Sequence, residues 1–232
     1  MRILFLGDII GLPGCKAVNS HLPKIIKKHQ IDFVIVNGEN CAKNGMGITE
    51  EIANSLFKSG VNVITSGNHI WDQKETATHI KKEDRLLRPF NSYDQAPGKG
   101  FKVYNLESNF KICVLNLMGN IFMKKSKNVF KTAKKFIENN YLKKNYYFLV
   151  VDFHTETSTE KMAMGHFFDG KATLVIGTHT HVPTNDARIL KNGTAYQTDA
   201  GMTGNYDSVM GYDKNIFIKR FLREGVKKNF PK

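Results

Sequence analysis

The sequence predicts an α/β protein built on a largely parallel sheet. Short apolar runs alternate along the chain with stretches of helical spacing, and polar residues follow the apolar runs at five places. A parallel strand buried on both faces reads as a continuous apolar run, and open α/β sheets place their sites at the carboxyl ends of strands. With 232 residues and 41% hydrophobic content, we expect a single domain spanning residues 1–232.

The first half of the chain repeats a pattern of strand, helix and strand. Apolar runs at residues 2–7, 33–36 and 61–65 predict strands. The spacing of residues 14–28 and 49–58 predicts two crossover helices, the second opened by a Thr-x-Glu cap pattern. Polar side chains follow each predicted strand. They are Asp8, then Glu39 and Asn40, then Asn68 and His69.

The second half is less regular but follows the same principle. After loops marked by proline and glycine, residues 101–106 and 111–117 predict an antiparallel strand pair, and residues 125–140 predict a lysine-rich helix. The remaining predicted elements are a strand at 146–151, a helix at 159–168 and strands at 173–176 and 193–198. The polar residues after these strands include His154, His179 and His181. A glycine-punctuated loop at 201–206 could lie near them.

These carboxylate, amide and imidazole side chains suit divalent manganese, iron or zinc. Two such ions about 3.5 to 4 Å apart can hold both the attacking and the leaving oxygen of a displacement at phosphorus. Glu39 is the candidate bridge, because a carboxylate has two oxygens whereas an imidazole ligates through one nitrogen. Asp8 would hold one ion and Asn68 the other. His179 and His181 are two residues apart, so in an extended segment both would project to the same side.

Each residue taken singly also has a structural explanation. Asp8 could cap a helix, and Glu39 could be an exposed loop acid. Asn40 could shape a turn, and His154 could be a hydrogen-bonded histidine of the core. Their joint occurrence at five strand ends favours a metal site over five separate explanations.

The formal net charge of +13, from 34 basic and 21 acidic residues, favours anionic partners such as phosphates, nucleotides or RNA. Much of the excess positive charge is local, because one predicted helical region combines a run of lysines with a single acidic residue, Glu138. The run comprises Lys124, Lys125, Lys127, Lys131, Lys134, Lys135, Lys143 and Lys144. We favour a solvated helix face over an RNA-docking surface, because readers of RNA bases combine basic residues with stacking aromatic residues.

The chain has no apolar run near the roughly twenty residues that a membrane-spanning helix needs, so we expect a soluble protein without a membrane partner. The short apolar stretch at the N-terminus is not followed by a small-residue cleavage site, which favours a cytoplasmic protein over a secreted one. Cys15, Cys41 and Cys113 are scattered and odd in number, which fits reduced thiols.

The motifs resemble the calcineurin-like metallophosphoesterase superfamily, whose pattern runs Gly-Asp-x-His, Gly-Asp, Gly-Asn-His, His and Gly-His-x-His. Within it, the chain is similar to the YmdB-like family over most of its length. The matching segments are Gly7-Asp8-Ile9-Ile10-Gly11, Asn37-Gly38-Glu39-Asn40, Ser66-Gly67-Asn68-His69-Ile70-Trp71-Asp72, Asp152-Phe153-His154, Gly177-Thr178-His179-Thr180-His181 and Thr198-Asp199-Ala200-Gly201. Ile10 replaces a metal-binding His of the superfamily and Glu39 replaces its usual Asp bridge, and this branch shares both departures.

The resemblance implies a four-layer αββα sandwich and metal-dependent phosphodiesterase activity toward 2′,3′-cyclic nucleotides such as 2′,3′-cAMP. It also implies two divalent metal ions, iron or manganese before zinc, and a homo-oligomer. By matching position, one ion is held by Asp8, Glu39, Asn40 and His181, and the other by Glu39, Asn68, His154 and His179. His69 is left for catalysis, and no substrate-binding residue is assigned.

We expect a hydroxide held between the ions to attack phosphorus in line, with His69 protonating the departing ribose oxygen. Two alternatives stay open. The same ions could activate water against a monoester, which describes a phosphomonoesterase or nucleotidase. The lysine run and the net charge would also fit a low-turnover, RNA-associated regulatory protein. Compared with the family, this sequence ends soon after residues 221–223, where other members continue into further strands.

Overall fold

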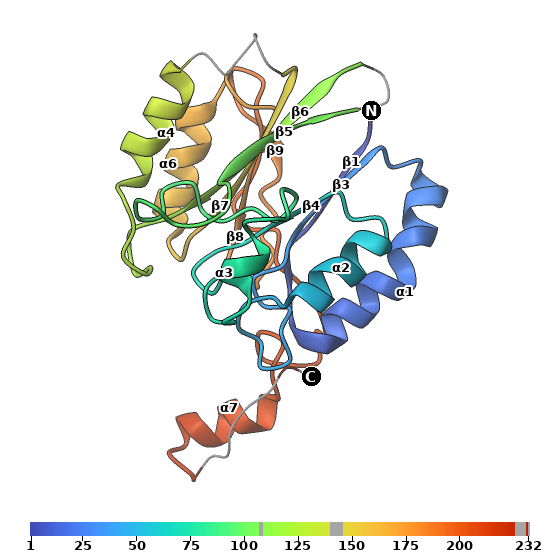
Figure 1. Cartoon of the computed structure of the whole chain (residues 1–232). Coiled ribbons are helices and arrows are strands. Elements are labelled where there is room, and N and C mark those ends of the chain that lie inside the picture. Colours follow the sequence, from blue (N-terminus) through green and yellow to red (C-terminus); the bar gives the residue numbers. More distant parts are fainter. Residues whose placement is uncertain (107–108, 140–145, 226–230, 232) are drawn as a thin grey trace.

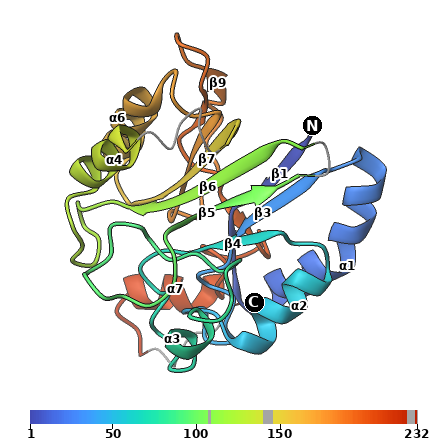
Figure 2. The same ribbon diagram turned by 45° about the horizontal axis from the view of Figure 1, so that its top comes forward.

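Two β-sheets lie face to face between two pairs of helices. The structure is a computed structural model that describes residues 1–106, 109–139, 146–225 and 231. The paired helices are α1 (Gly11–His29) and α2 (Glu50–Lys58) on one side, and α4 (Val129–Glu138) and α6 (Ser158–Phe168) on the other (Figures 1 and 2). This arrangement confirms the expected four-layer αββα sandwich.

The first sheet comes from the N-terminal part of the chain. Its parallel strands lie in the order β1 (Ile3–Leu6), β3 (Phe33–Asn37) and β4 (Val63–Thr65), which confirms all three predicted strands. α2 follows its predicted cap, because the Thr49 side chain accepts a hydrogen bond from the Ile52 amide at 3.2 Å. α1 begins earlier than predicted, since Pro13 is tolerated in the first turn of a helix.

The second sheet is mixed. Its order is β5 (Phe101–Asn105), β6 (Lys111–Met118), β7 (Phe148–His154), β8 (Leu174–Thr178), β10 (Ala195–Gln197) and β9 (Arg188–Ile189). β5 and β6 pair antiparallel as predicted, and the β6, β7, β8 and β10 strands are parallel. β7 extends three residues beyond its predicted end, so His154 is its last residue.

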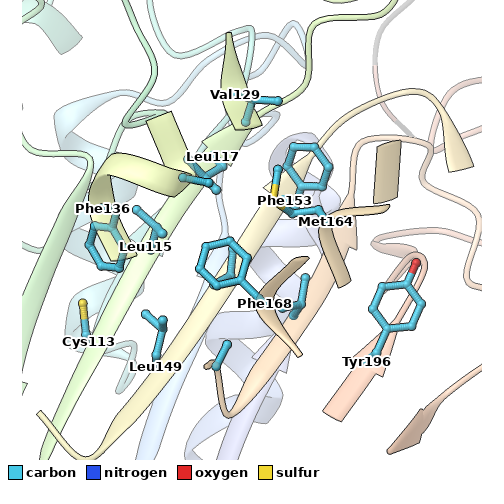
Figure 3. Packing of buried hydrophobic residues seen from close by; sticks show 14 of the residues in the cluster. Cys113, Leu115, Leu117, Val129, Phe136, Leu149, Phe153, Met164, Phe168 and Tyr196 are labelled. Atoms are coloured by element: carbon cyan, nitrogen blue, oxygen red, sulfur yellow. The ribbon is translucent and has the colours of Figure 1, made fainter. Parts of the chain in front are cut away.

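Three apolar clusters separate the four layers. Val34 and Val36 of β3 belong to the cluster under α1 and α2, whereas Phe33 and Ile35 of the same strand belong to the cluster between the sheets. This alternation follows from the two-residue period of a strand. The third cluster, which includes Phe153, lies under α4 and α6 (Figure 3). Because β3 is buried on both faces, it reads as an uninterrupted apolar run.

A separate two-stranded sheet joins segments that are distant in the sequence. β2 (Asp8–Ile9) pairs in parallel with β11 (Met202–Thr203), which brings the loop at 201–206 beside Asp8. Among the described residues, the remaining helices are α3 (Thr76–His79) and α7 (Lys214–Phe221). α7 has no buried residue and extends away from the layers in Figure 1. Within the described ranges, no helix combines the length and apolarity needed to cross a membrane.

The lysine-rich helix was predicted too long. α4 begins at Val129, because the Asn128 side chain caps it by accepting a hydrogen bond from the Lys131 amide at 2.9 Å. Lys124, Lys125 and Lys127 therefore lie in the loop that precedes α4. Lys143 and Lys144 lie outside the described residues.

Candidate metal centre

Polar side chains from both sheets meet at the carboxyl ends of the strands. The Nε2 atom of His154, at the end of β7, lies 2.9 Å from Glu39 Oε1 and 3.2 Å from Asn68 Oδ1. His179, which follows β8, places Nδ1 3.0 Å from the same Nε2 atom. One donor atom each from Glu39, His154 and His179 fits within a span of 4.8 Å. That spacing suits ligands of a shared cation.

Asp8 and His181 extend this cluster. Asp8 Oδ1 lies 3.8 Å from His154 Nδ1 and 3.9 Å from His181 Nε2. Asp8 Oδ2 accepts a hydrogen bond from the His179 amide at 3.1 Å. Five of the predicted metal ligands therefore join His154 in one cluster, although Asp8 and His181 are 173 positions apart in the numbering.

Two buried oxygens of predicted metal ligands have no hydrogen-bond partner among the residues that the structure describes. They are Asp8 Oδ1 and Asn40 Oδ1. The Asn40 side-chain nitrogen donates to the Gly45 carbonyl at 2.7 Å, so the side-chain oxygen of Asn40 points away from that carbonyl. Burial raises the pKa of Asp8, since a carboxylate charge is unfavourable away from water. Unpaired buried oxygens are costly, and a divalent cation would satisfy them, so the residues present fit a metal.

Neighbouring groups select the nitrogen that each buried histidine presents. Thr178 Oγ1 donates to Asp152 at 2.7 Å, so it accepts from His154 Nδ1, which lies 2.9 Å away. His181 Nδ1 lies 3.1 Å from the Met210 carbonyl oxygen, which can only accept. In both imidazoles Nδ1 is therefore held by a protein oxygen, and Nε2 is the nitrogen that would bind a cation.

The charges of the cluster are coupled. Burial alone would raise the pKa of Glu39, but the His154 imidazolium beside it lowers that pKa to about 2. Burial would likewise favour neutral His154, whereas Glu39 and Asp8 raise its pKa to about 9. Burial and the charge of His154 lower the pKa of His179 to about 3. A metal that binds here must displace the His154 proton.

The loop that carries His179 and His181 has a strained backbone. Their φ angles are 104° and 64°, a region that residues other than glycine rarely adopt. Asp199 fixes the residue between them by accepting hydrogen bonds from the amide and the hydroxyl of Thr180 at 3.3 and 2.8 Å. Lys161, which is buried, donates to Asp199 at 2.5 Å. Strain that is held by its surroundings in this way is typical of functional sites.

His69 lies next to the cluster with a partly exposed side chain. Its backbone amide donates to Glu39 Oε2 at 3.1 Å, and its ring Nδ1 lies 2.6 Å from Asp72 Oδ2. Asp72 in turn accepts a hydrogen bond from Lys124 at 2.9 Å. Asp72 thus orients the ring by holding Nδ1, and Nε2 is the remaining ring nitrogen of His69.

Known proteins resemble this chain in sequence and in fold. The sequence profile described as YmdB-like protein matches residues 4–232. The chain belongs to the YmdB-like protein family. It is 45% identical over 221 residues to the 2′,3′-cyclic-nucleotide 2′-phosphodiesterase of Bacillus subtilis (strain 168), a match that covers 95% of this chain and 82% of that protein.

Two solved structures resemble this YmdB-like protein closely. A novel phosphatase from Mycoplasma pneumoniae matches with a TM-score of 0.91 at 35% identity, covering 100% of this chain and 83% of that one. A hypothetical protein from Thermus thermophilus matches with a TM-score of 0.89 at 39% identity, covering 100% of this chain and 88% of that one.

The YmdB-like site also contains three carboxylates that the sequence pattern assigned neither to a metal nor to catalysis. Asp72 and Asp152 stand four and two positions from ligand candidates, which is a usable signal in the sequence. Asp199 has no such neighbour, and only the fold brings it to Lys161 and Thr180. Asp72 also meets Lys124, which is far along the chain.

Proposed function

We propose that this chain is a metal-dependent phosphodiesterase that hydrolyses 2′,3′-cyclic nucleotides such as 2′,3′-cAMP. The observation that carries the proposal is the convergence of acidic, amide and imidazole side chains around buried oxygens that lack partners among the described residues. The name of the Bacillus subtilis relative supports the same activity, because the two chains align over nearly the whole length of this one.

The metal ligands are assigned by position in two overlapping sets. One set is Asp8, Glu39, Asn40 and His181, and the other is Glu39, Asn68, His154 and His179. Carboxylate, amide and imidazole ligands accept manganese, iron and zinc, and the family resemblance places manganese or iron before zinc. When bound, such ions supply a Lewis acid for the phosphate and lower the pKa of water.

The chain's own residues account for the proton that the reaction requires. Hydrolysis adds the oxygen of water to phosphorus and breaks the bond from phosphorus to the ribose O2′, which then takes up a proton. His69 donates this proton from Nε2 while Asp72 holds Nδ1. The product is a nucleoside 3′-phosphate.

Activity on paired substrates tests the proposal. Protein reconstituted separately with manganese, iron and zinc would be assayed on 2′,3′-cAMP and bis-p-nitrophenyl phosphate, and on the monoesters 3′-AMP and p-nitrophenyl phosphate. The proposal expects turnover of the diesters and its loss in Glu39→Gln. Turnover of the monoesters alone would identify a phosphomonoesterase instead. A metal-loaded protein that binds RNA but leaves every ester intact would identify a regulatory protein.

We further propose that the chain forms a homo-oligomer and acts in the cytoplasm. Light scattering on the metal-loaded protein measures the first of these predictions, and fractionation of the source cells measures the second.

A further inference from the structure

Two aromatic side chains that are distant in the sequence lie near the loop of Lys124, Lys125 and Lys127 that precedes α4. Tyr93 is 57% exposed, and its ring centroid lies 6.3 Å from that of Trp71. Trp71 immediately precedes Asp72, which accepts a hydrogen bond from Lys124. Basic and aromatic side chains therefore occur together at the edge of the metal centre, which is the combination that binds single-stranded nucleic acid.

Hydrogen bonds fasten this arrangement in place. The Lys127 amide donates to the Asn91 carbonyl at 2.9 Å, and the Asn91 side chain donates to the Lys127 carbonyl at 3.0 Å. The Asn91 side chain is buried and also donates to the Met118 carbonyl at 2.7 Å. The segment that carries Tyr93 is thus tied to the loop that precedes α4.

A cavity of about 380 Å³ continues from Tyr93 toward α4. Its charged lining residues are the cations Arg88, Lys127 and Lys135 and one carboxylate, Asp94, which pairs with Lys127. Arg88 donates to backbone carbonyls, including that of Pro97 at 3.1 Å, so it shapes the loop while adding positive charge. Lys135 is exposed on α4 and lines the same cavity. A positive cavity lined in part by an exposed tyrosine suits a phosphate backbone with attached bases.

We propose that the substrate class includes single-stranded RNA whose 3′ end carries a 2′,3′-cyclic phosphate. The terminal phosphate enters the metal centre, and the preceding nucleotides lie over Tyr93 and reach the cavity that Lys135 lines. This inference rests on the proposed function and extends it from mononucleotides to RNA ends. DNA is excluded, because the cyclic phosphate requires a ribose 2′-hydroxyl.

The chemical step is the same for an RNA end as for a mononucleotide. The oxygen of water bonds to phosphorus, the bond from phosphorus to the terminal O2′ breaks, and O2′ takes up a proton. The RNA leaves with a 3′-phosphate and a free 2′-hydroxyl. The bonds between the preceding nucleotides stay intact, so the oligomer keeps its length.

The experiment compares a six-nucleotide RNA ending in a 2′,3′-cyclic phosphate with 2′,3′-cAMP on the metal-loaded protein. Tyr93→Ala and Lys135→Ala should each lower kcat/KM for the oligomer by about tenfold and change that for 2′,3′-cAMP by less than about twofold. The matched controls are Tyr147→Ala and Lys28→Ala. Tyr147 is 68% exposed and precedes β7 at the amino end of that strand, whereas His154 lies at its carboxyl end, and Lys28 is exposed on α1.

A binding measurement separates docking from turnover. The fluorescence anisotropy of a labelled six-nucleotide RNA ending in a 3′-phosphate should report weaker binding to Tyr93→Ala and Lys135→Ala than to the controls. Equal kcat/KM values for oligomer and mononucleotide, unaltered by both variants, would overturn the inference and leave the proposed function standing. If neither substrate is hydrolysed although RNA binding depends on Tyr93 and Lys135, the proposed function fails while the surface is confirmed.

Discussion

His69 differs from the other histidines of the site in its surroundings. Its side chain is 27% exposed, whereas that of His154 is fully buried. Its ring is held by Asp72, at 2.6 Å, and its backbone contacts Glu39 without the ring joining the buried cluster. These contacts suit a group that moves a proton rather than one that holds a cation.

Replacing His69 should therefore slow the reaction and spare the metals. His69→Ala is expected to lower kcat by about 10²- to 10⁴-fold, the usual contribution of a positioned acid, while metal content by elemental analysis stays at the wild-type level. Thr78→Ala, at an exposed position of α3, serves as the control. Loss of both metals from His69→Ala would instead make this residue part of the metal centre.

We expect His154 to set the pH dependence of metal binding. Burial opposes its charge, but Glu39 and Asp8 raise its pKa to about 9, so the metal-free site holds a proton below that pH. Because a cation must displace this proton, the apparent metal affinity should rise by about tenfold for each pH unit between roughly 6 and 9 and then level off. Calorimetric titration with Mn²⁺ measures the slope. A flat profile across this range would show that His154 is neutral before metal arrives.

The ligand candidates could be predicted from the sequence because each one lies next to an apolar run. An apolar strand must end where the sheet ends, so polar residues such as Glu39 and Asn68 are placed by local pattern alone. Contacts between side chains that are distant in the sequence could not be predicted in this way. Asp72 meets Lys124 and Asp199 meets Lys161 across 52 and 38 positions, and no local periodicity encodes either contact.

At the scale of elements, strands were predicted more accurately than helix ends. The Asn128 cap, which shortens the lysine-rich helix, depends on one side-chain hydrogen bond that lysine spacing does not reveal. Short strands such as β2 and β11 could not be predicted at all, because two residues carry no period and their pairing joins positions 8 and 202.

The cap itself can be tested. Asn128→Ala should lower the free energy of unfolding by about 1 kcal/mol, since the Lys131 amide loses its acceptor. Asn128→Ser keeps an acceptor and should stay close to wild type. Urea unfolding followed by circular dichroism gives both values. Equal stability of the two variants would mean that the cap does not determine where α4 begins.

At the scale of the whole molecule, the cluster between the sheets joins the two halves of the chain. Phe33 and Ile35 from the first sheet share this buried cluster with Val114 and Val150 from the second. The candidate metal ligands also come from both sheets. We therefore propose that residues 1–232 form one cooperative domain, as the length and composition predict.

Equilibrium unfolding tests whether the chain is one cooperative domain. Trp71 packs against the apolar cluster under α1 and α2. In urea, far-ultraviolet circular dichroism and Trp71 fluorescence should therefore give the same unfolding midpoint. Saturating Mn²⁺ should move both midpoints together, because a ligand that binds only the folded state stabilises the entire cooperative unit. Two separated transitions would instead divide the chain into independent halves.

We expect side chains from separate strands to hold two cations in one site. Anomalous diffraction from crystals grown with Mn²⁺ measures this directly. Two manganese peaks should lie in contact with Glu39, one of them also touching Asp8 and His181 and the other Asn68, His154 and His179. A single peak away from Glu39, or peaks scattered over different parts of the surface, would contradict it.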